Sequence, residues 1–365
     1  MTRLPTWADV VLVPLVSLLL AAMISGFVIL AMGQSPLEAL DTMVTGALGS
    51  AYGWGYTLYY ATSFMFTGLA VTVAFHAGLF NIGGEGQAQI GGLGVALVCL
   101  ALPWPHWTLA LACATVGAAL FGAAWAAIPA FLQAKRGSHI VITTIMFNYI
   151  AAAVIVYLLV DVLRPAGQMD PATARFPEGA KLPTLNEIPV FNLIFTKGVP
   201  ANVTLFIALA MAVVVWLLLW RTRLGYQIRA FGKSEPAARY AGINPFFVIM
   251  VAMMISGALA GMMSINNVMG EAERLLQNSS EGAGFIGIAV ALMGRNHPVG
   301  VVLAALLFGF LYQGGAELGM FTAIPIELRI VVQGLVILFT GALDMMVRRM
   351  LGFVFAMARR PAGVA

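Results

Sequence analysis

A few polar side chains stand inside long apolar stretches of this chain, and their types suit the binding of a ligand. They are Asn81, Glu85, Gln87, Asn148, Tyr149, Asn266 and Asn267. A polar group at membrane depth is costly unless it is paired or faces water. Two interpretations follow: hydrogen bonds between helices, or a polar pathway for a neutral, polar solute. No Lys or Arg cluster lies within the apolar stretches, which disfavours an anionic solute held by direct charge pairing.

Two nucleotide-binding patterns occur, and neither has the context that nucleotide chemistry needs. Residues 282–287 fit GxGxxG, but they lie in an apolar run and no strand precedes them. A dinucleotide site needs that pattern between a strand and a helix. Residues 232–234 read Gly-Lys-Ser like the end of a P-loop, yet Gln227 stands where its first glycine belongs. We therefore expect no ATP hydrolysis by this chain alone.

Residue clusters for catalysis or metal binding are also missing from the sequence. No HExxH, CxxC or GxSxG pattern occurs. Cys99 and Cys113 lie in apolar stretches and are interpreted as small packing residues. The sequence therefore predicts no catalytic residue, no metal site and no cofactor.

A short helix with clear end signals is predicted inside the basic segment 221–245. Ser234 suits the N-cap, and a glutamate and a proline suit the first turn. Three alanines give the helix a small face, and a glycine ends it. The residues are Glu235, Pro236, Ala237, Ala238, Arg239, Tyr240, Ala241 and Gly242. A capped helix between two membrane spans favours a docking element over a loop whose positive charge only keeps it in the cytoplasm.

Composition shows what kind of elements must position these residues. The chain has 365 residues, of which 61% are hydrophobic and 9% are charged, whereas a soluble domain carries roughly 25% charged residues. The fold class is therefore predicted to be all-α, a polytopic transmembrane bundle in a lipid bilayer that moves a solute. The net charge of +4 does not indicate nucleic acid, because the basic residues fall between the apolar runs.

Ten apolar stretches meet or approach the about 20 residues that a spanning helix needs. They are 8–32, 54–77, 86–103, 107–133, 139–161, 201–220, 246–269, 283–294, 298–316 and 328–346. The first is too long for a signal-peptide core and has no clear cleavage site, so a retained helix is expected. The glycine-rich stretch 78–94 and the short stretch 283–294 are each either full spans or re-entrant helices.

The placement of Lys and Arg predicts that both termini are cytoplasmic. With the N-terminus inside, cytoplasmic segments hold all but six of the 19 Lys and Arg residues. The loop 162–200 is then external, and 221–245 is a cytoplasmic loop. Glycine-rich starts near 83–94 and 282–294 favour an inverted repeat, a common plan of transporters. Residues 1–365 are predicted to form one transmembrane domain.

Small-residue pairs predict close packing between helices. Gly257 and Gly261 form a GxxxG pair, as do Gly315 and Gly319. Such pairs let helix backbones approach closely, within a bundle or between two chains. They carry no chemistry of their own.

At these motifs the chain resembles a known family. Residues 235–242 are similar to the coupling-helix motif of ABC importer permeases, E-x-A-A-x-x-x-G. Residues 78–87, Gly-Leu-Phe-Asn-Ile-Gly-Gly-Glu-Gly-Gln, resemble the signature of simple-sugar, branched-chain amino acid and nucleoside permeases. Within this branch they look most like nucleoside permeases paired with basic-membrane-protein lipoproteins. Residues 284–294 also match, and the likeness covers roughly 55–345.

The resemblance implies a heteromeric importer in a bacterial cytoplasmic membrane. Two permease chains, alike or different, would form the pathway, and an external solute-binding lipoprotein would deliver the solute. Cytoplasmic ABC ATPase subunits would dock on Glu235–Gly242, and Asn81, Glu85 and Gln87 would lie near the pathway. Nucleosides are the expected solutes, with simple sugars as the alternative.

Two other classes of protein remain as alternatives from the sequence. A self-sufficient secondary transporter would need an ion-coupling site, for which Glu85 and Glu271 are the candidates. Solute flux driven by an ion gradient, with this chain alone in liposomes, would favour that class. A membrane-embedded enzyme would need a catalytic cluster, and turnover by the isolated chain would favour it.

Overall fold

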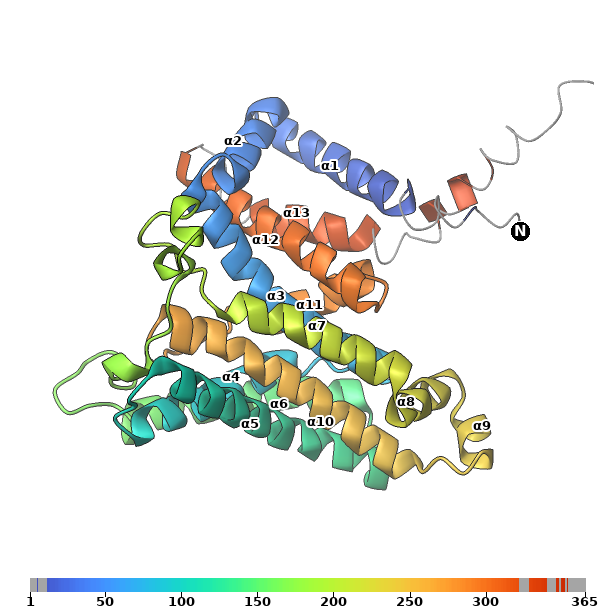
Figure 1. The fold of residues 1–365 in the computed structure, drawn as a ribbon. Helices are drawn as coiled ribbons and strands as arrows, with labels where there is room; N and C mark the ends of the chain where they lie inside the picture. The colour runs from blue at the N-terminus through green and yellow to red at the C-terminus, as the bar shows by residue number, and fades with distance from the viewer. Residues whose placement is uncertain are drawn as a thin grey trace, which may run out of the picture. The chain divides into compact units, whose positions relative to one another are not determined.

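The computed structural model describes residue 5, residues 12–321 and 328–339, and a few positions between 346 and 353. Within these residues the chain forms helices, turns and two isolated β-bridges, and no strand is present. Figure 1 shows the helices coloured along the chain. The predicted all-α class is confirmed.

Every predicted apolar stretch coincides with a helix, although the first and last stretches extend into residues outside the described part. The α-helices are α1 (Val13–Ala31), α2 (Pro36–Leu48), α3 (Ala51–His76), α4 (Gly84–Ala101), α5 (Trp107–Arg136), α6 (Ile140–Tyr157), α7 (Thr204–Arg221), α8 (Arg223–Lys233), α9 (Glu235–Tyr240), α10 (Pro245–Ser264), α11 (Ala283–Met293), α12 (Pro298–Phe321) and α13 (Leu328–Ile337). Turns of π-helix follow α6 at Leu158–Val162 and α10 at Ile265–Glu271, and 3-10 turns lie at Glu178–Ala180, Leu185–Glu187 and Phe191–Leu193.

Seven helices of the described chain are long and apolar enough to cross a bilayer. They are Val13–Ala31, Ala51–His76, Trp107–Arg136, Ile140–Val162, Thr204–Arg221, Pro245–Glu271 and Pro298–Met320. The 11-residue α11 is apolar but short, and α4 begins with the polar and glycine-rich residues 84–89. The chain is therefore a polytopic membrane protein, while the number of ten spans and the cytoplasmic termini stay predictions.

The chain divides into two compact units. Unit 1 contains Met1–Gly49 and Phe310–Ala365, and unit 2 contains Ser50–Gly309. In unit 1, Val13 of α1 packs with Val347 and Leu351. Every site residue predicted from the sequence lies in unit 2. The single domain over 1–365 stays a prediction.

The core of unit 2 forms where α10 packs along α5, α3 and α4 (Figure 1). On α10, Gly257 and Gly261 face the α5 backbone at Gly122 and Ala118, so closely that a Cβ at either glycine would overlap a carbonyl oxygen of α5. Backbones approach in this way only where side chains are absent. The predicted packing role of this glycine pair is confirmed.

Gly261→Ala is expected to destabilise the folded protein by about 1–3 kcal/mol, the usual cost of overpacking. Its Cβ would overlap the Ala118 carbonyl and lie 3.1 Å from Gly122 Cα, and neither is a flexible side chain. Thermal unfolding of the purified protein in detergent measures the effect. Gly26→Ala is the control, because its Cβ would make an ordinary 3.6 Å contact with Pro36. Equal melting temperatures for both variants would contradict this packing.

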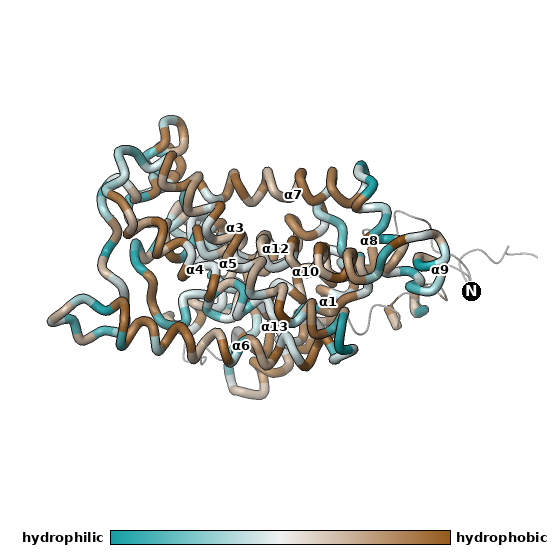
Figure 2. The backbone as a smooth tube through the Cα atoms, turned by 90° about the horizontal axis from the view of Figure 1, so that it is seen from below, coloured by the Kyte–Doolittle hydropathy of each residue, from teal (hydrophilic) through white to brown (hydrophobic). Residues whose placement is uncertain are grey.

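Hydrophilic segments of unit 2 gather at the two ends of its apolar helices (Figure 2). One end holds α8 and α9, and the other holds the 162–200 segment, drawn in green in Figure 1. The topology predicted from the sequence requires this separation, since it places the two segments on opposite sides of the membrane.

Candidate functional site

Glu85 lies in the first turn of α4, and its carboxylate also caps the start of α11. Oε1 accepts hydrogen bonds from the Gly282 amide (3.0 Å) and the Ser280 hydroxyl (2.5 Å), and Oε2 accepts one from the Gly284 amide (2.9 Å). A carboxylate near a helix N-terminus interacts favourably with the helix dipole. Here α4 and α11 both begin at the Glu85 carboxylate. The two glycine-rich starts noted in the sequence therefore meet at one buried carboxylate, which is 5% exposed.

Asn81 and Gln87 pair their side-chain amides in the turn that leads into α4. Asn81 Nδ2 donates to Gln87 Oε1 (2.9 Å), and Gln87 Nε2 donates to Asn81 Oδ1 (3.2 Å). Asn81 Nδ2 also donates to Ser256 Oγ on α10 (2.9 Å), and that hydroxyl donates to the Ala70 carbonyl on α3 (2.7 Å). This network fixes the turn before α4 to two long helices.

Asn148 of α6 holds the same turn from the other side. Its Nδ2 donates to the Ile82 carbonyl (2.9 Å), and its Oδ1 accepts from the Gly86 amide (2.9 Å). Tyr149 follows it and is 70% exposed, since consecutive residues of an α-helix point about 100° apart. The structure therefore brings Asn148 to the start of α4 and turns Tyr149 away from it.

Asn266 and Asn267 form a second buried polar group, in the π-helical turn that follows α10. Asn266 Nδ2 donates to Ser63 Oγ on α3 (2.9 Å), and its Oδ1 accepts from Asn202 Nδ2 (3.1 Å). Asn267 Oδ1 accepts from the Ser63 hydroxyl (2.8 Å), and its Nδ2 donates to the Ser279 carbonyl (2.9 Å). π-helical turns occur frequently at functional sites.

Six of the seven predicted pathway residues are thus buried and hydrogen-bonded to other parts of unit 2, Tyr149 being the exception. Segment 279–280 connects the two polar groups, because Ser279 contacts Asn267 and Ser280 contacts Glu85. Sequence reasoning missed four of the partners: Ser63, Asn202, Ser256 and Ser280. A single serine or asparagine among apolar or loop residues gives no signal until its neighbours in space are known.

Gln89 lies one helical turn beyond Glu85 on α4 and has spare hydrogen-bonding capacity. It is 6% exposed, and its Oε1 has no hydrogen-bond partner among the residues that the structure describes. Buried acceptors are nearly always paired with protein or ordered water. Oε1 is therefore a candidate acceptor for a water or a passing solute beside the two polar groups.

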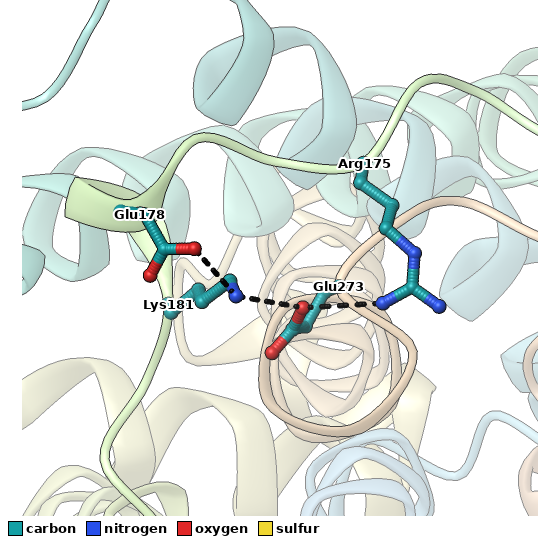
Figure 3. A network of polar contacts seen from close by, with 4 residues as sticks. All are labelled: Arg175, Glu178, Lys181 and Glu273. Carbon is teal, nitrogen blue, oxygen red and sulfur yellow. Dashed lines mark ion pairs between the residues drawn. The ribbon is translucent and has the colours of Figure 1, made fainter.

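The 162–200 segment is tied to the turn at 271–282 that carries Ser279 and Ser280. The Phe176 amide donates to the Glu273 carbonyl (2.8 Å). Glu273 Oε2 lies 3.5 Å from both Arg175 Nη1 and Lys181 Nζ, and Lys181 also pairs with Glu178 at 2.8 Å (Figure 3). The hydrogen bond with Glu178 and the charge of Glu273 raise the pKa of Lys181. Hydrogen bonds and ion pairs therefore hold the 162–200 segment against the turn at 271–282.

At the opposite end, the predicted short helix is present as α9 with both of its predicted end signals. Ser234 Oγ accepts from the Ala237 amide (3.4 Å), and Glu235 pairs with Arg239 at 2.7 Å. Gly242 takes a left-handed φ of +81°, and its amide donates to the Arg239 carbonyl (3.0 Å). Of residues 235–242 only Ala238 is buried, and Tyr240 is 96% exposed. A short capped helix therefore presents almost its whole surface for contact.

The helix before it, α8, packs on the turn that holds Asn81. A Cβ at Gly232 would overlap the His76 carbonyl and lie 2.7 Å from the Gly78 amide, so the two backbones touch. The His76 ring also lies 5.2 Å from the ring of Trp220 at the end of α7. Contacts of α8 therefore join the α9 segment to the turn before α4.

Comparison with known proteins decides what kind of protein carries these features. A family model described as the branched-chain amino acid transport system / permease component matches residues 53–341. The chain belongs to this family of permeases. It is the membrane-spanning permease subunit of an ABC importer and a transport component rather than an enzyme. The resemblance of the chain to such permeases is thereby confirmed.

Three curated relatives match this permease along nearly its whole length. The guanosine ABC transporter permease protein NupP of Bacillus subtilis is 34% identical over 91% of this chain and 93% of its own. The nucleoside ABC transporter permease protein NupB of Lactococcus lactis is 33% identical over 90% of each chain. The glucose ABC transporter permease protein TsgB13 of Haloferax volcanii is 32% identical over 94% and 90%. Membership implies that ATPase and substrate-binding partners act with this permease in a membrane.

Proposed function

We propose that this permease imports nucleosides across a bacterial cytoplasmic membrane. It acts with a second permease chain, two cytoplasmic ABC ATPase subunits and an external solute-binding lipoprotein. The observation that carries the proposal is the similarity to NupP and NupB, whose names specify guanosine and nucleosides, over at least 90% of both chains. Neutral, polar nucleosides also suit a protein whose buried polar side chains are mostly amides and hydroxyls.

Simple sugars form the second candidate class of solute. The permease TsgB13, named for glucose, is 32% identical over most of both chains. Both classes are neutral and carry hydroxyl groups, so amides suit either. Nucleosides add a planar base that can stack on an aromatic side chain.

For the coupling role, we propose that Glu235–Gly242 docks on the ATPase subunits. Support comes from the exposure of α9, from its caps at Ser234 and Gly242, and from its connection through α8 to the turn at Gly78. Closure of the ATPases would displace α9, and α8 would transmit the displacement to the starts of α4 and α11. Packed elements respond to such displacements by switching between discrete arrangements, which suits alternating access.

For the pathway, we propose that six buried polar residues hold in place the helix starts that border the pathway. They are Asn81, Glu85, Gln87, Asn148, Asn266 and Asn267. Their bonds to partners on other helices support this positioning role. Tyr149 is exposed, so its contact with the solute would come from the outer face of α6. Gln89 Oε1, a buried acceptor without a partner among the described residues, is our candidate contact for the solute itself.

A transport measurement with the complete complex tests the choice of solute. In proteoliposomes with ATP inside and binding lipoprotein outside, labelled guanosine is expected to accumulate, and unlabelled nucleosides should compete while glucose and pentoses should not. Discrimination of this kind arises because buried polar groups stay unpaired with the wrong ligand. Competition by sugars alone would overturn the nucleoside assignment and leave the importer class intact. Uptake without ATP or the ATPases would overturn the importer mechanism.

A further inference from the structure

An apolar groove lies between α7 and α12 in unit 2. Its volume is about 520 Å³, within the usual range of ligand pockets. It is lined by Leu209, Ala212, Val213, Trp216, Pro298, Val299, Val302 and Leu303. Pockets for polar ligands contain a few placed polar groups that orient the ligand, and this groove has none apart from the indole nitrogen of Trp216. Its body therefore suits hydrocarbon.

Both walls of the groove belong to helices that are long and apolar enough to span a membrane. Val213 is 56% exposed, Val299 is 61% exposed and Leu303 is 64% exposed. Side chains of this type on a spanning helix meet acyl chains in a bilayer. The groove is thus open along a face where lipid is the surrounding solvent.

The end of the groove near Trp216 is cationic and aromatic. The Arg221 guanidinium lies 5.2 Å from the Trp216 ring, and Arg229 lies 5.9 Å from the ring of Trp220. The His297 ring is 5.1 Å from Trp220. Tryptophan is enriched where a spanning helix leaves the hydrocarbon layer. The groove therefore reaches the membrane–water interface beside exposed arginine.

We propose that this groove binds an anionic phospholipid, with an acyl chain along α7 and α12 and the headgroup phosphate on Arg221. A neutral lipid would supply the same hydrocarbon, but it would leave the cationic end of the groove near Trp216 without a partner of net negative charge. Guanidinium and phosphate form strong charge-assisted hydrogen bonds, and basic pockets between spanning helices on the cytoplasmic side suit anionic headgroups. Charge complementarity at this cationic end of the groove therefore favours an anionic over a neutral phospholipid.

The bound lipid lies next to the segment that leads to α9. Arg221 ends α7, and Thr222 both follows it and caps α8 through its hydroxyl, which accepts from the Gly225 amide (3.0 Å). A lipid between α7 and α12 fixes the end of α7 and hence the start of α8. The bound anionic lipid therefore stabilises the junction between α7 and α8, whatever solute the permease carries.

Native mass spectrometry of the complete complex, purified from mixed phosphatidylglycerol and phosphatidylcholine, tests the proposal. The unmodified permease is expected to retain phosphatidylglycerol preferentially. Arg221→Gln should reduce that preference about ten-fold, the effect of losing one charge-assisted contact. Arg221→Lys should keep most of it.

Lys135→Gln is the matched control, because Lys135 also lies over an aromatic ring, 4.7 Å from Phe246, at the end of a spanning helix but away from the groove. It should leave the preference unchanged. Equal retention of both lipids by the unmodified permease would overturn the proposal, as would an equal loss in Arg221→Gln and Lys135→Gln. Retention of no lipid would mean that a helix of this chain or of the second permease fills the groove, and would also overturn it.

Discussion

Glu235→Arg is expected to reduce ATP-driven uptake by the complete complex by roughly two orders of magnitude, the effect of losing a charged contact at a docking interface. Glu235 lies in the first turn of α9, where a negative charge is favourable, and it pairs with Arg239 at 2.7 Å. Arginine reverses the charge at the helix start, removes the ion pair and places two positive groups one turn apart. The surface offered to the ATPase therefore changes in charge and order.

Gly242→Pro tests the same helix without changing a charge. Gly242 has φ +81°, and proline holds φ near −65°. The substitution also removes the amide that donates to the Arg239 carbonyl at the end of α9. The direction in which the chain leaves α9 must then change, and uptake is again expected to be lost.

Uptake in vesicles, ATPase co-purification and membrane insertion should be measured on both variants. Insertion should be intact, because residues 235–242 lie outside the spanning helices. Asp41→Arg is the control, since it reverses the charge of an exposed residue on α2, far in sequence from α9. Normal uptake by both α9 variants would refute the docking role, whereas lost uptake in Asp41→Arg would show that charge reversal itself is harmful.

The short helix could be predicted because its determinants are local. An N-cap serine, a proline in the first turn and a glycine beyond the last turn act within a few residues of one another. The same rule could have found α2, which is missing from the helices predicted above. Ser35 caps it through the Glu38 amide, a pattern visible in the sequence, but the mixture of acidic and apolar residues in α2 hides it from a search for apolar spans.

The contacts of the buried polar residues could not be predicted from the sequence. Asn148 meets the turn at Ile82 across 66 positions, and Asn266 meets Ser63 across 203. Periodicity places a residue on a helix but does not show which other helix lies opposite. Sequence patterns therefore predicted Asn81, Gln87 and Asn148 at membrane depth, while only the packing shows that they bond to each other's segments.

Glu85→Ala is expected to destabilise the permease by about 2–6 kcal/mol, because two backbone amides lose their acceptor. The Glu85 carboxylate accepts three hydrogen bonds, from Ser280, Gly282 and Gly284. Alanine leaves the buried Gly284 amide and the half-buried Gly282 amide at the start of α11 without an acceptor, and each such loss costs about 1–3 kcal/mol. The start of α11 should then separate from α4, and both folded yield and uptake should fall.

Glu85→Gln separates the hydrogen bonds from the charge. Its one amide oxygen can still accept from Ser280 and Gly282, but its NH2 group would face the Gly284 amide, donor against donor. The shape is kept, so an intermediate melting temperature is expected by thermal unfolding in detergent. Glu317→Ala is the matched control: Glu317 is a half-buried carboxylate on α12 that accepts one side-chain hydrogen bond, from Gln313 at 2.9 Å. Glu317→Ala is expected to lower the free energy of unfolding by about 1 kcal/mol.

The order of the melting temperatures of Glu85→Ala, Glu85→Gln and Glu317→Ala tests whether Glu85 holds the starts of α4 and α11 together. No side chain at position 284 could take over the role of Glu85, because a Cβ there would overlap the Glu85 backbone. The starts of α4 and α11 already touch at this point. If Glu85→Ala melted no lower than Glu317→Ala, the carboxylate would contribute no more than an ordinary single hydrogen bond. The route from α9 through α8 to the starts of α4 and α11 would then lack its fixed end, and the displacement of α9 would have to reach the pathway by another set of contacts.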